Sequence, residues 1–458
     1  MGLLLLALVS AAVWFLAGFG PVAAGYTATM GATQVYGTGD SIEVVVAERV
    51  RLPFGLGRFL HLEVIEEDRP LVRARAFGLF EADATWRAGL GATRVMDGTL
   101  ALPRSIPDLV PPLSDIELWP RGDSPELASL PTEVRAGVEA AFDRVFRDAE
   151  GNSNGTHAAC LIVEGKLVAE RYREGYDRFT PILGWSMTKS VTAALIGRSI
   201  ALGRLSSVDM PAPVPEWSTE GDPRAAITLE HLLRMQSGLE FFANYELPWA
   251  DSVQMLFIED DFAAYAAAKP LAHPPGSTWY YSDGTANILA RIVRRHAGDT
   301  LDEQLSFPQR ELFAHLHMST AILSVDPSGT WVGSSLMLAS ARDWARFGQL
   351  YIEDGKVDGV RILPPGWVDF AASATPQSDG RSYGGAQIWR FDEEDLVDVR
   401  GNPVPGELGG ILYAAGHDGQ YVWIDRARHL VLVRLGILEP GFDPVEFLTE
   451  IVGQFPKK

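Results

Sequence analysis

Between residues 158 and 203 the apolar side chains change their spacing, and this change restricts the chain to folds that combine strands with helices. Residues 158–163 and 167–172 are strand-like runs joined by Glu164-Gly165-Lys166, which predicts a β-hairpin. The apolar positions that follow recur at helical spacing as far as Gly203, a residue type that commonly ends helices. These residues are therefore predicted to form a β-hairpin followed by a helix.

The composition is that of a globular protein with a large core. Hydrophobic residues make up 47% of the 458 residues and aromatic residues 10%, which excludes disordered and collagen-like chains. The net charge of −20 repels phosphate backbones, so nucleic acid is excluded as an expected partner. Cys160 is the single cysteine, so neither an intramolecular disulfide nor a cysteine zinc cage can form. Its place in the first strand predicts a small core residue.

The N-terminus predicts export. No charged side chain precedes Asp40, and residues 3–19 form an apolar run of signal-peptide or short membrane-span length. Val22 and Ala24 then occupy the small-residue positions of a cleavage site. We therefore expect residues 1–24 to be a signal peptide or a membrane anchor, with the protein periplasmic or held on the cytoplasmic membrane with its catalytic domain outside. The alternative is that this run is a buried helix of the fold.

The rest of the chain divides into two expected units. Residues 25–120 form an N-terminal β-rich segment and linker, in which residues 42–46 and 60–64 alternate as strands do. The stretch 108–125 is rich in Pro, Asp and Ser, as linkers are. Helical spacing over residues 127–148 then opens the unit that we expect to span residues 125–458.

Ser186 and Lys189 form the first chemical motif. Ser186 sits where the helix begins, and Lys189 follows one turn later on the same face. An unprotonated lysine there can take the proton of the serine hydroxyl, and the helix N-terminus favours the negative charge that develops. The alternative is an amphipathic helix with a surface lysine, because Ser-x-x-Lys by itself is a weak signal.

Two further elements follow in sequence order. Tyr281-Ser282-Asp283 ends an aromatic run just before a predicted helix, where the tyrosine could equally serve core packing. His417-Asp418-Gly419-Gln420 precedes a strand at residues 421–424 that returns as a second strand at residues 430–435. The value of both elements lies in their order and setting, since each short motif alone is non-specific.

Together these motifs resemble the serine β-lactamase and penicillin-binding-protein superfamily, in which a Ser-x-x-Lys element, a Tyr-bearing element and a third cationic element occur in this order. The surrounding sequence is most similar to the class C β-lactamase-related hydrolases, and closest to the 6-aminohexanoate-dimer hydrolase branch. Further resemblances lie at residues 227–239, 339–348 and 362–367. The resemblance covers about residues 125–455. It implies an α/β (α+β) fold with an antiparallel sheet flanked by helices and an all-helical subdomain.

The resemblance also implies roles for individual residues, in a reaction that needs no cofactor or metal. Ser186 would be the acylated nucleophile, Lys189 its general base or proton relay, and Tyr281 the shuttle that protonates the leaving group. His417 would orient the substrate or Tyr281. The oxyanion hole would consist of the backbone N–H groups of Ser186 and Gln420.

The substrate contacts implied by the resemblance are Tyr245, Asp283 and Gly419. One of them departs from the family pattern, which usually has Asn or Ser where this chain has Asp283. A carboxylate beside Lys189 would raise the pKa of the lysine and would lack an amide donor for a substrate carbonyl. The alternative is that Asp283 points away and caps the following helix. The departure favours esters or linear amides over β-lactams.

Three functions follow as hypotheses. The first is a serine hydrolase that cleaves small amides or esters through an acyl-serine intermediate. The second is a peptidoglycan-directed DD-peptidase or penicillin-binding protein, and the third is a catalytically silent binding module of the same fold. The expected partner is a small amide or ester, with membrane attachment as an option for the N-terminal segment.

Overall fold

The computed structural model describes residues 2–50, 53–66, 70–96, 101–147, 151, 153–378, 382–392, 397–398, 403–439 and 442–457. Its largest sheet has six strands in the order β12-β13-β14-β15-β5-β6, and every neighbouring pair is antiparallel. The strands are β5 (Thr156–Val163), β6 (Lys166–Tyr172), β12 (Trp389–Arg390), β13 (Leu412–Gly416), β14 (Gln420–Asp425) and β15 (Leu430–Gly436). The sheet therefore joins the predicted hairpin near the middle of the chain to the predicted strand pair near its end.

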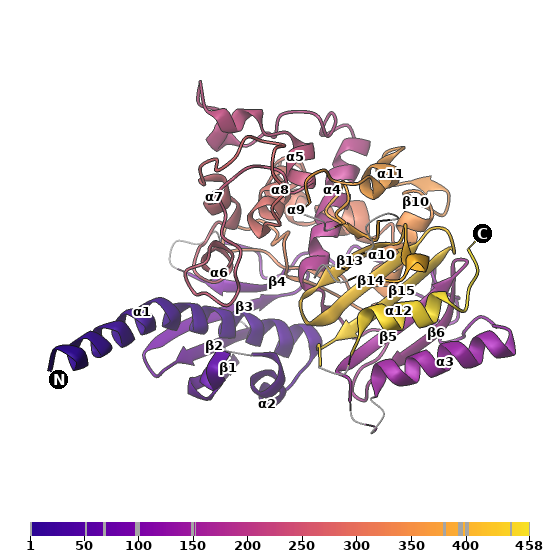
Figure 1. Cartoon of the computed structure of the whole chain (residues 1–458), viewed down its shortest axis with the longest axis horizontal. Coiled ribbons are helices and arrows are strands. Elements are labelled where there is room, and N and C mark those ends of the chain that lie inside the picture. Colours follow the sequence, from indigo (N-terminus) through magenta and orange to yellow (C-terminus); the bar gives the residue numbers. More distant parts are fainter. Residues whose placement is uncertain are drawn as a thin grey trace.

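Helices cover both faces of this sheet (Figure 1). Alternate residues of β5 enter different cores: Ala158 and Cys160 pack with α10 (Ala341–Ile352), while Ala159 and Leu161 pack with α3 (Thr132–Phe146) and α12 (Pro444–Val452). Cys160 is fully buried, and its Sγ donates to the carbonyl oxygen of Ala341 at 3.3 Å. Burial raises the pKa of this thiol, so the prediction of a small core residue is confirmed.

A largely helical region stands above one end of the sheet (Figure 1). Its helices are α4 (Thr188–Ala201), α5 (Leu229–Leu233), α6 (Asp251–Phe257), α7 (Phe262–Ala267), α8 (Asp283–Arg295), α9 (Leu301–Leu305) and α11 (Trp367–Ala372). A small antiparallel sheet adjoins it, formed by β7 (Ile182–Leu183), β9 (Met337–Ala339) and β8 (Ile322–Leu323) in that order, and β10 (Lys356–Val357) pairs with β11 (Val360–Arg361). The expected fold class, an antiparallel sheet flanked by helices with a helical subdomain, is confirmed.

The N-terminal residues form a helix packed on a second sheet. Strands β1 (Leu60–Glu66), β2 (Pro70–Ala76), β3 (Phe80–Arg87) and β4 (Gly91–Val95) are antiparallel in sequence order, and α1 (Gly2–Ala32) lies across them. Figure 1 shows the first part of α1 extending past the sheet, whereas its second part is covered. Phe19, Val22, Ala23 and Ala24 are all buried there.

The expected end of the signal peptide or anchor, residue 24, therefore lies within the buried second part of the continuous helix α1. Counting only residues whose side chains the structure describes, which in α1 begin at Phe15, no helix is long and apolar enough to cross a membrane. Export, cleavage and anchoring of residues 1–24 stay predictions.

One strand prediction is wrong. Residues 42–46 form α2 (Ile42–Val44) and the start of a short π-helix. The reason is local: the side chain of Ser41 accepts a hydrogen bond from the backbone N–H of Val44 and caps the helix, which outweighs the β propensity of the valines. The strand predicted at residues 60–64 is confirmed as part of β1.

The predicted linker at residues 108–125 is irregular, as expected, but α10 of the unit expected at residues 125–458 forms hydrogen bonds with its end. Arg346 donates to the carbonyl oxygens of Pro120 and Gly122 and forms an ion pair with Asp123 at 2.8 Å. Trp119 and Asp123 are buried, whereas most of residues 108–118 are exposed, so only the end of this segment packs into the core.

Candidate active site

Ser186 lies at a tight turn that leads into α4. It is the middle residue of a 3-10 turn, Trp185–Met187, and α4 begins at Thr188. The turn is held by a hydrogen bond from Met187 N to Gly184 O at 3.2 Å, and Trp185 has a positive φ of 48°. This turn leaves Ser186 half-buried, while the residues that follow enter the core.

Lys189 is enclosed beside Ser186. Its side chain is 1% exposed, so the alternative of a surface lysine is wrong. An ammonium group has three N–H donors. Lys189 Nζ donates to Ser186 Oγ at 2.9 Å, to Asp283 Oδ1 at 2.6 Å and to the carbonyl oxygen of Ser334 at 2.9 Å. The charged form of Lys189 therefore has all three of its donors satisfied.

Asp283 brings a carboxylate into the same enclosure. It is the first residue of α8, whose N-cap is Ser282: the Ser282 side chain accepts from Thr285 N. The side chain of Asp283 is thus free of the capping role and turns to Lys189, with 1% of its surface exposed. Its second oxygen, Oδ2, accepts a short hydrogen bond from the Tyr245 hydroxyl. The departure from the family pattern therefore contacts Lys189, and the alternative of a helix cap is wrong.

The pKa of Lys189 is the balance of opposing effects. Burial by itself lowers this pKa, but the neighbouring Asp283 and Tyr281 outweigh burial and raise it above the usual lysine value. The expected direction is confirmed. Tyr245 responds similarly, because burial of its hydroxyl and the charge of Asp283 hold its pKa well above the usual value, although 56% of the residue as a whole is exposed.

Tyr281 lies between the lysine and an aromatic cluster. Lys189 Nζ is 4.8 Å from the centroid of the Tyr281 ring. On its other side the ring stacks on Trp389 at 5.4 Å and meets Tyr383 edge-on at 6.1 Å. Aromatic packing and proximity to Lys189 therefore coexist at Tyr281, and the two interpretations of this residue do not exclude each other.

The third element forms a turn between β13 and β14. His417 is 71% exposed; its ring meets Trp185 edge-on at 5.3 Å, and its Nε2 lies 3.6 Å from Asp418 Oδ1. Gly419 has a φ of +75° and is buried. His417 thus contacts Trp185 of the Ser186 turn and its own neighbour Asp418, and its imidazole stays open to solvent.

Gln420 begins β14 and is fastened to the next strand. Its side-chain amide donates to Gly436 O and accepts from Gly436 N at 2.9 Å. Gln420 is therefore held by β15 through its side chain, and its backbone lies in register with Gly416 of β13.

Two contributors to the site escaped the sequence interpretation. The carbonyl oxygen of Ser334 accepts a hydrogen bond from the third N–H group of Lys189, and no sequence motif marks position 334. Gly416 lies so close to the Ser186 turn that a Cβ added to it would be 2.2 Å from Gly184 O. The sequence pattern gives position 416 no role, yet this close approach joins the third element to the first.

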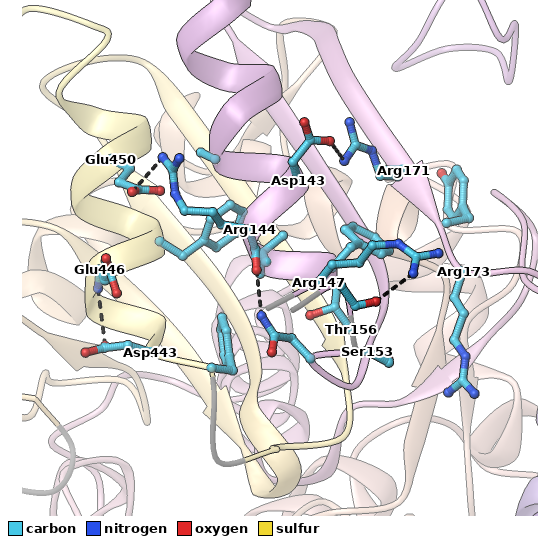
Figure 2. Close-up of a pocket in the computed structure, with 18 of the residues that line it drawn as sticks. Asp143, Arg144, Arg147, Ser153, Thr156, Arg171, Arg173, Asp443, Glu446 and Glu450 are labelled. Carbon is cyan, nitrogen blue, oxygen red and sulfur yellow. Dashed lines mark hydrogen bonds and ion pairs between the residues drawn. The ribbon is translucent and has the colours of Figure 1, made fainter. Parts of the chain in front are cut away.

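The structure also contains a cavity of about 760 Å³ in another place, between α3, α12 and β6 (Figure 2). Charged side chains line it, and several are paired: Asp143 with Arg171, and Arg144 with Glu450. None of the motif residues described above is part of its wall. Among the described residues, no group of three or more His, Cys, Asp or Glu side chains could hold a metal ion.

Comparison with known proteins identifies the family. The profile of the Beta-lactamase family matches residues 142–443, which is well over half of the chain. The chain belongs to the Beta-lactamase family. The suspected membership of the serine β-lactamase and penicillin-binding-protein superfamily is thereby confirmed, and the matched residues include all three motifs.

Two curated proteins extend this finding. The 6-aminohexanoate-dimer hydrolase of Paenarthrobacter ureafaciens is 27% identical over 294 residues, which cover 60% of this chain and 71% of that protein. Protein Rv1367c of Mycobacterium tuberculosis is 27% identical over 291 residues, which cover 56% of this chain and 66% of that protein. These relatives support a hydrolase-type activity for this member of the Beta-lactamase family.

Solved structures support the fold. A Bacillus anthracis protein described as a candidate 6-aminohexanoate-dimer hydrolase matches with a TM-score of 0.53 and 22% identity, over 81% of this chain and 89% of that one. A penicillin-binding-protein homologue of Caulobacter crescentus matches with a TM-score of 0.52 and 19% identity, over 72% of this chain and all of that one.

Proposed function

We propose that this member of the Beta-lactamase family is a serine hydrolase that cleaves small amides or esters through an acyl-serine intermediate, with Ser186 as its nucleophile. The observation that carries the proposal is the 2.9 Å hydrogen bond between Lys189 Nζ and Ser186 Oγ at a half-exposed turn. A hydroxyl that shares a proton with a buried amine is the arrangement that activates serine for nucleophilic attack.

Lys189 must be neutral before it can accept the serine proton. Its ammonium form has all three protons donated, so one of them has to leave first. Asp283 accepts one of these hydrogen bonds at 2.6 Å. Its charge raises the pKa of Lys189 and so opposes the loss of that proton. Asp283 thus lowers the fraction of Lys189 that is neutral and ready to act.

The reaction then proceeds in two halves. As Ser186 Oγ bonds to the substrate carbonyl carbon, its proton passes to Lys189. Tyr281, beside the lysine, relays that proton to the leaving nitrogen or oxygen as the bond to the carbonyl carbon breaks. Water attacks the acyl-serine in the second half, its proton returns along the same route to Ser186 Oγ, and a carboxylic acid is released. The backbone N–H groups of Ser186 and Gln420 hold the oxyanion in both halves.

Substrate selection falls to groups around the nucleophile. The exposed imidazole of His417 lies against Trp185 and can orient a substrate at the mouth of the site. Tyr245 and Gly419 complete the proposed contacts. Because Asp283 replaces an amide side chain and is engaged by Lys189 and Tyr245, the proposal favours esters and linear amides over β-lactams.

Intact mass after exposure to two reagents tests this proposal. A fluorophosphonate adduct on Ser186 without a penicillin adduct supports the amide or ester hydrolase. Adducts with both reagents favour a penicillin-binding peptidase, and adducts with neither favour a silent binding module. Turnover of a panel of p-nitrophenyl esters and anilides then ranks the substrates.

We propose further that the protein is exported, either to the periplasm or to the outer surface of the cytoplasmic membrane. The uncharged run at residues 3–19 supports this location. Fractionation with a cytoplasmic marker tests it, and recovery of the full-length chain with that marker contradicts it.

A further inference from the structure

Arg434 is a fully buried cation behind the third element of the site. It lies on β15 opposite Tyr421 of β14 and is 0% exposed. Burial lowers the pKa of its guanidinium to about 9, so the group is still charged at neutral pH. Burying a charge is costly unless every donor is satisfied, which makes the partners of Arg434 informative.

These partners are neutral oxygens, and two of them belong to the turn that follows His417. Arg434 Nη1 donates to the carbonyl oxygens of Asp418 and Gly419, both at 3.0 Å. Its other hydrogen bonds are to Thr156 Oγ1 at 3.0 Å, to Ile437 O at 2.7 Å and to Asn154 O at 3.4 Å. The guanidinium also lies 4.3 Å from the centroid of the Phe442 ring. One side chain thus ties the turn to the start of β5 and to the residue that follows β15.

The turn needs such support because its backbone is unusual. Asp418 has φ 60° and ψ 22°, and Gly419 has φ 75°, so two consecutive residues occupy the left-handed region. For a non-glycine residue this conformation is sparsely populated, and it persists when the surroundings hold it. The two carbonyl groups bound by Arg434 belong to these same two residues. The carbonyl of Gly419 shares its peptide unit with the N–H of Gln420, so fixing that carbonyl also fixes the direction of that N–H.

We propose that Arg434 is a positioning residue: it holds the peptide units of Asp418 and Gly419 so that the backbone N–H of Gln420 points at the reacting carbonyl oxygen. This inference rests on the proposed acyl-serine function. Arg434 touches neither Ser186 nor the substrate and acts only through the turn. Two other hydrogen-bond partners of Arg434, Asn154 and Thr156, line the cavity of Figure 2. The guanidinium therefore contacts both the lining of that cavity and the turn of the site.

The test measures the oxyanion interaction directly, in the full-length protein. A thionoester carries sulfur where the ester carries oxygen, and sulfur accepts hydrogen bonds poorly, so the ratio of kcat/KM for the two reports the quality of the oxyanion hole. Arg434→Met should lower kcat for the ester by about 10-fold to about 100-fold. This decrease does not exceed the one expected when a donor of the oxyanion hole is removed outright. The oxygen-to-sulfur ratio should fall with it. The acid limb of the pH profile should stay in place, because Lys189 and Asp283 are untouched.

Thr156→Val is the matched control, since it removes a hydrogen bond of the same guanidinium but not one to the turn. It should retain the wild-type ratio. Wild-type kcat and ratio in folded Arg434→Met overturn the proposal, because a purely structural role changes the melting temperature alone.

Arg434→Lys covers the case in which Arg434→Met does not fold. It keeps the charge, but one ammonium group cannot replace both the contacts of Nη1 with the turn and the contacts of Nε and Nη2 that hold the guanidinium in place. The oxygen-to-sulfur ratio should therefore fall again, and an unchanged ratio overturns the proposal. Failure of the underlying function is distinguishable, because in that case Ser186→Ala retains turnover whatever position 434 carries.

Discussion

Lys189 and Asp283 form an ion pair with 2.6 Å between Nζ and Oδ1, and each side chain is only 1% exposed. The residues are 94 positions apart in sequence and meet because α4 and α8 pack together. Removing one member of such a buried ion pair strongly destabilises the folded protein, because the other charge is left buried without a partner. In the proposed mechanism, Asp283 also affects the fraction of Lys189 that is neutral and able to accept the proton of Ser186.

Asp283→Asn should move the acid limb of the pH–rate profile to lower pH. Activity rises with pH as Lys189 loses its proton, and Asp283 raises the pKa of Lys189, so removal of the carboxylate charge lowers that pKa. The profile of kcat/KM against pH measures the shift, and the amide-to-ester ratio should rise because an amide donor is restored. Asp251→Asn is the control, because it removes an acid paired with a different lysine, Lys269. An acid limb that stays in place in Asp283→Asn contradicts the role of this carboxylate.

Ser186→Ala should lower turnover by at least about 10³-fold and abolish fluorophosphonate labelling, as expected for loss of a nucleophile. Ser199→Ala provides a control serine on α4, the helix that follows Ser186; the Ser199 hydroxyl donates to Leu195 O, so activity should persist. Circular dichroism verifies that both variants fold. Covalent labelling that survives in Ser186→Ala shows that another residue is the nucleophile.

Lys189→Ala and His417→Ala should differ in size of effect. Loss of the buried base should reduce kcat by about 100-fold or more, whereas loss of the exposed imidazole should act mainly on KM. The difference follows from their surroundings, since Lys189 donates to Ser186 Oγ and His417 is 71% exposed. Steady-state kinetics with one ester substrate separates the two. Equal losses of kcat would place His417 in the proton transfer as well.

Gly416→Ala should weaken both activity and stability. The new Cβ would lie 2.2 Å from Gly184 O, so β13 must move away from the Ser186 turn. Overpacking of this kind costs about 1 to 3 kcal/mol, measured as the free energy of unfolding in urea. At Gly57 the nearest atom to an added Cβ is 3.8 Å away, so Gly57→Ala should be close to neutral. If the two variants are equally stable and active, the close approach has no functional weight.

Deletion of residues 1–24 should destabilise the N-terminal sheet. It removes Phe19 and Val22, which are buried against the sheet, and each such side chain contributes about 1.5 to 3 kcal/mol. Urea unfolding measures the loss. A shorter deletion of residues 1–14 should be nearly neutral, because the first part of α1 extends past the sheet (Figure 1). Full stability after the longer deletion would agree with a cleaved signal peptide.

The sequence by itself determined the periodic elements and the local motif. The hairpin β5–β6, the helix that Ser186 precedes and the strand pair β14–β15 all follow from apolar spacing and turn residues, which act over a few positions. Ser186 and Lys189 are separated by one helical turn, so their meeting is also a local property. The failure at residues 42–46 is local too, since a single capping serine outweighed the strand propensity of the valines.

Only the tertiary structure decided what surrounds that motif. Asp283, the carbonyl of Ser334 and the close approach of Gly416 to Gly184 come from distant segments, and no spacing rule predicts which helix face or strand end they reach. Arg434 carried no signal at all, because a buried cation is recognised only by the partners that satisfy its donors. The proposed nucleophile was therefore predictable from short-range geometry, whereas the pKa of Lys189 and the backbone of the turn at Asp418 and Gly419 depend on long-range packing.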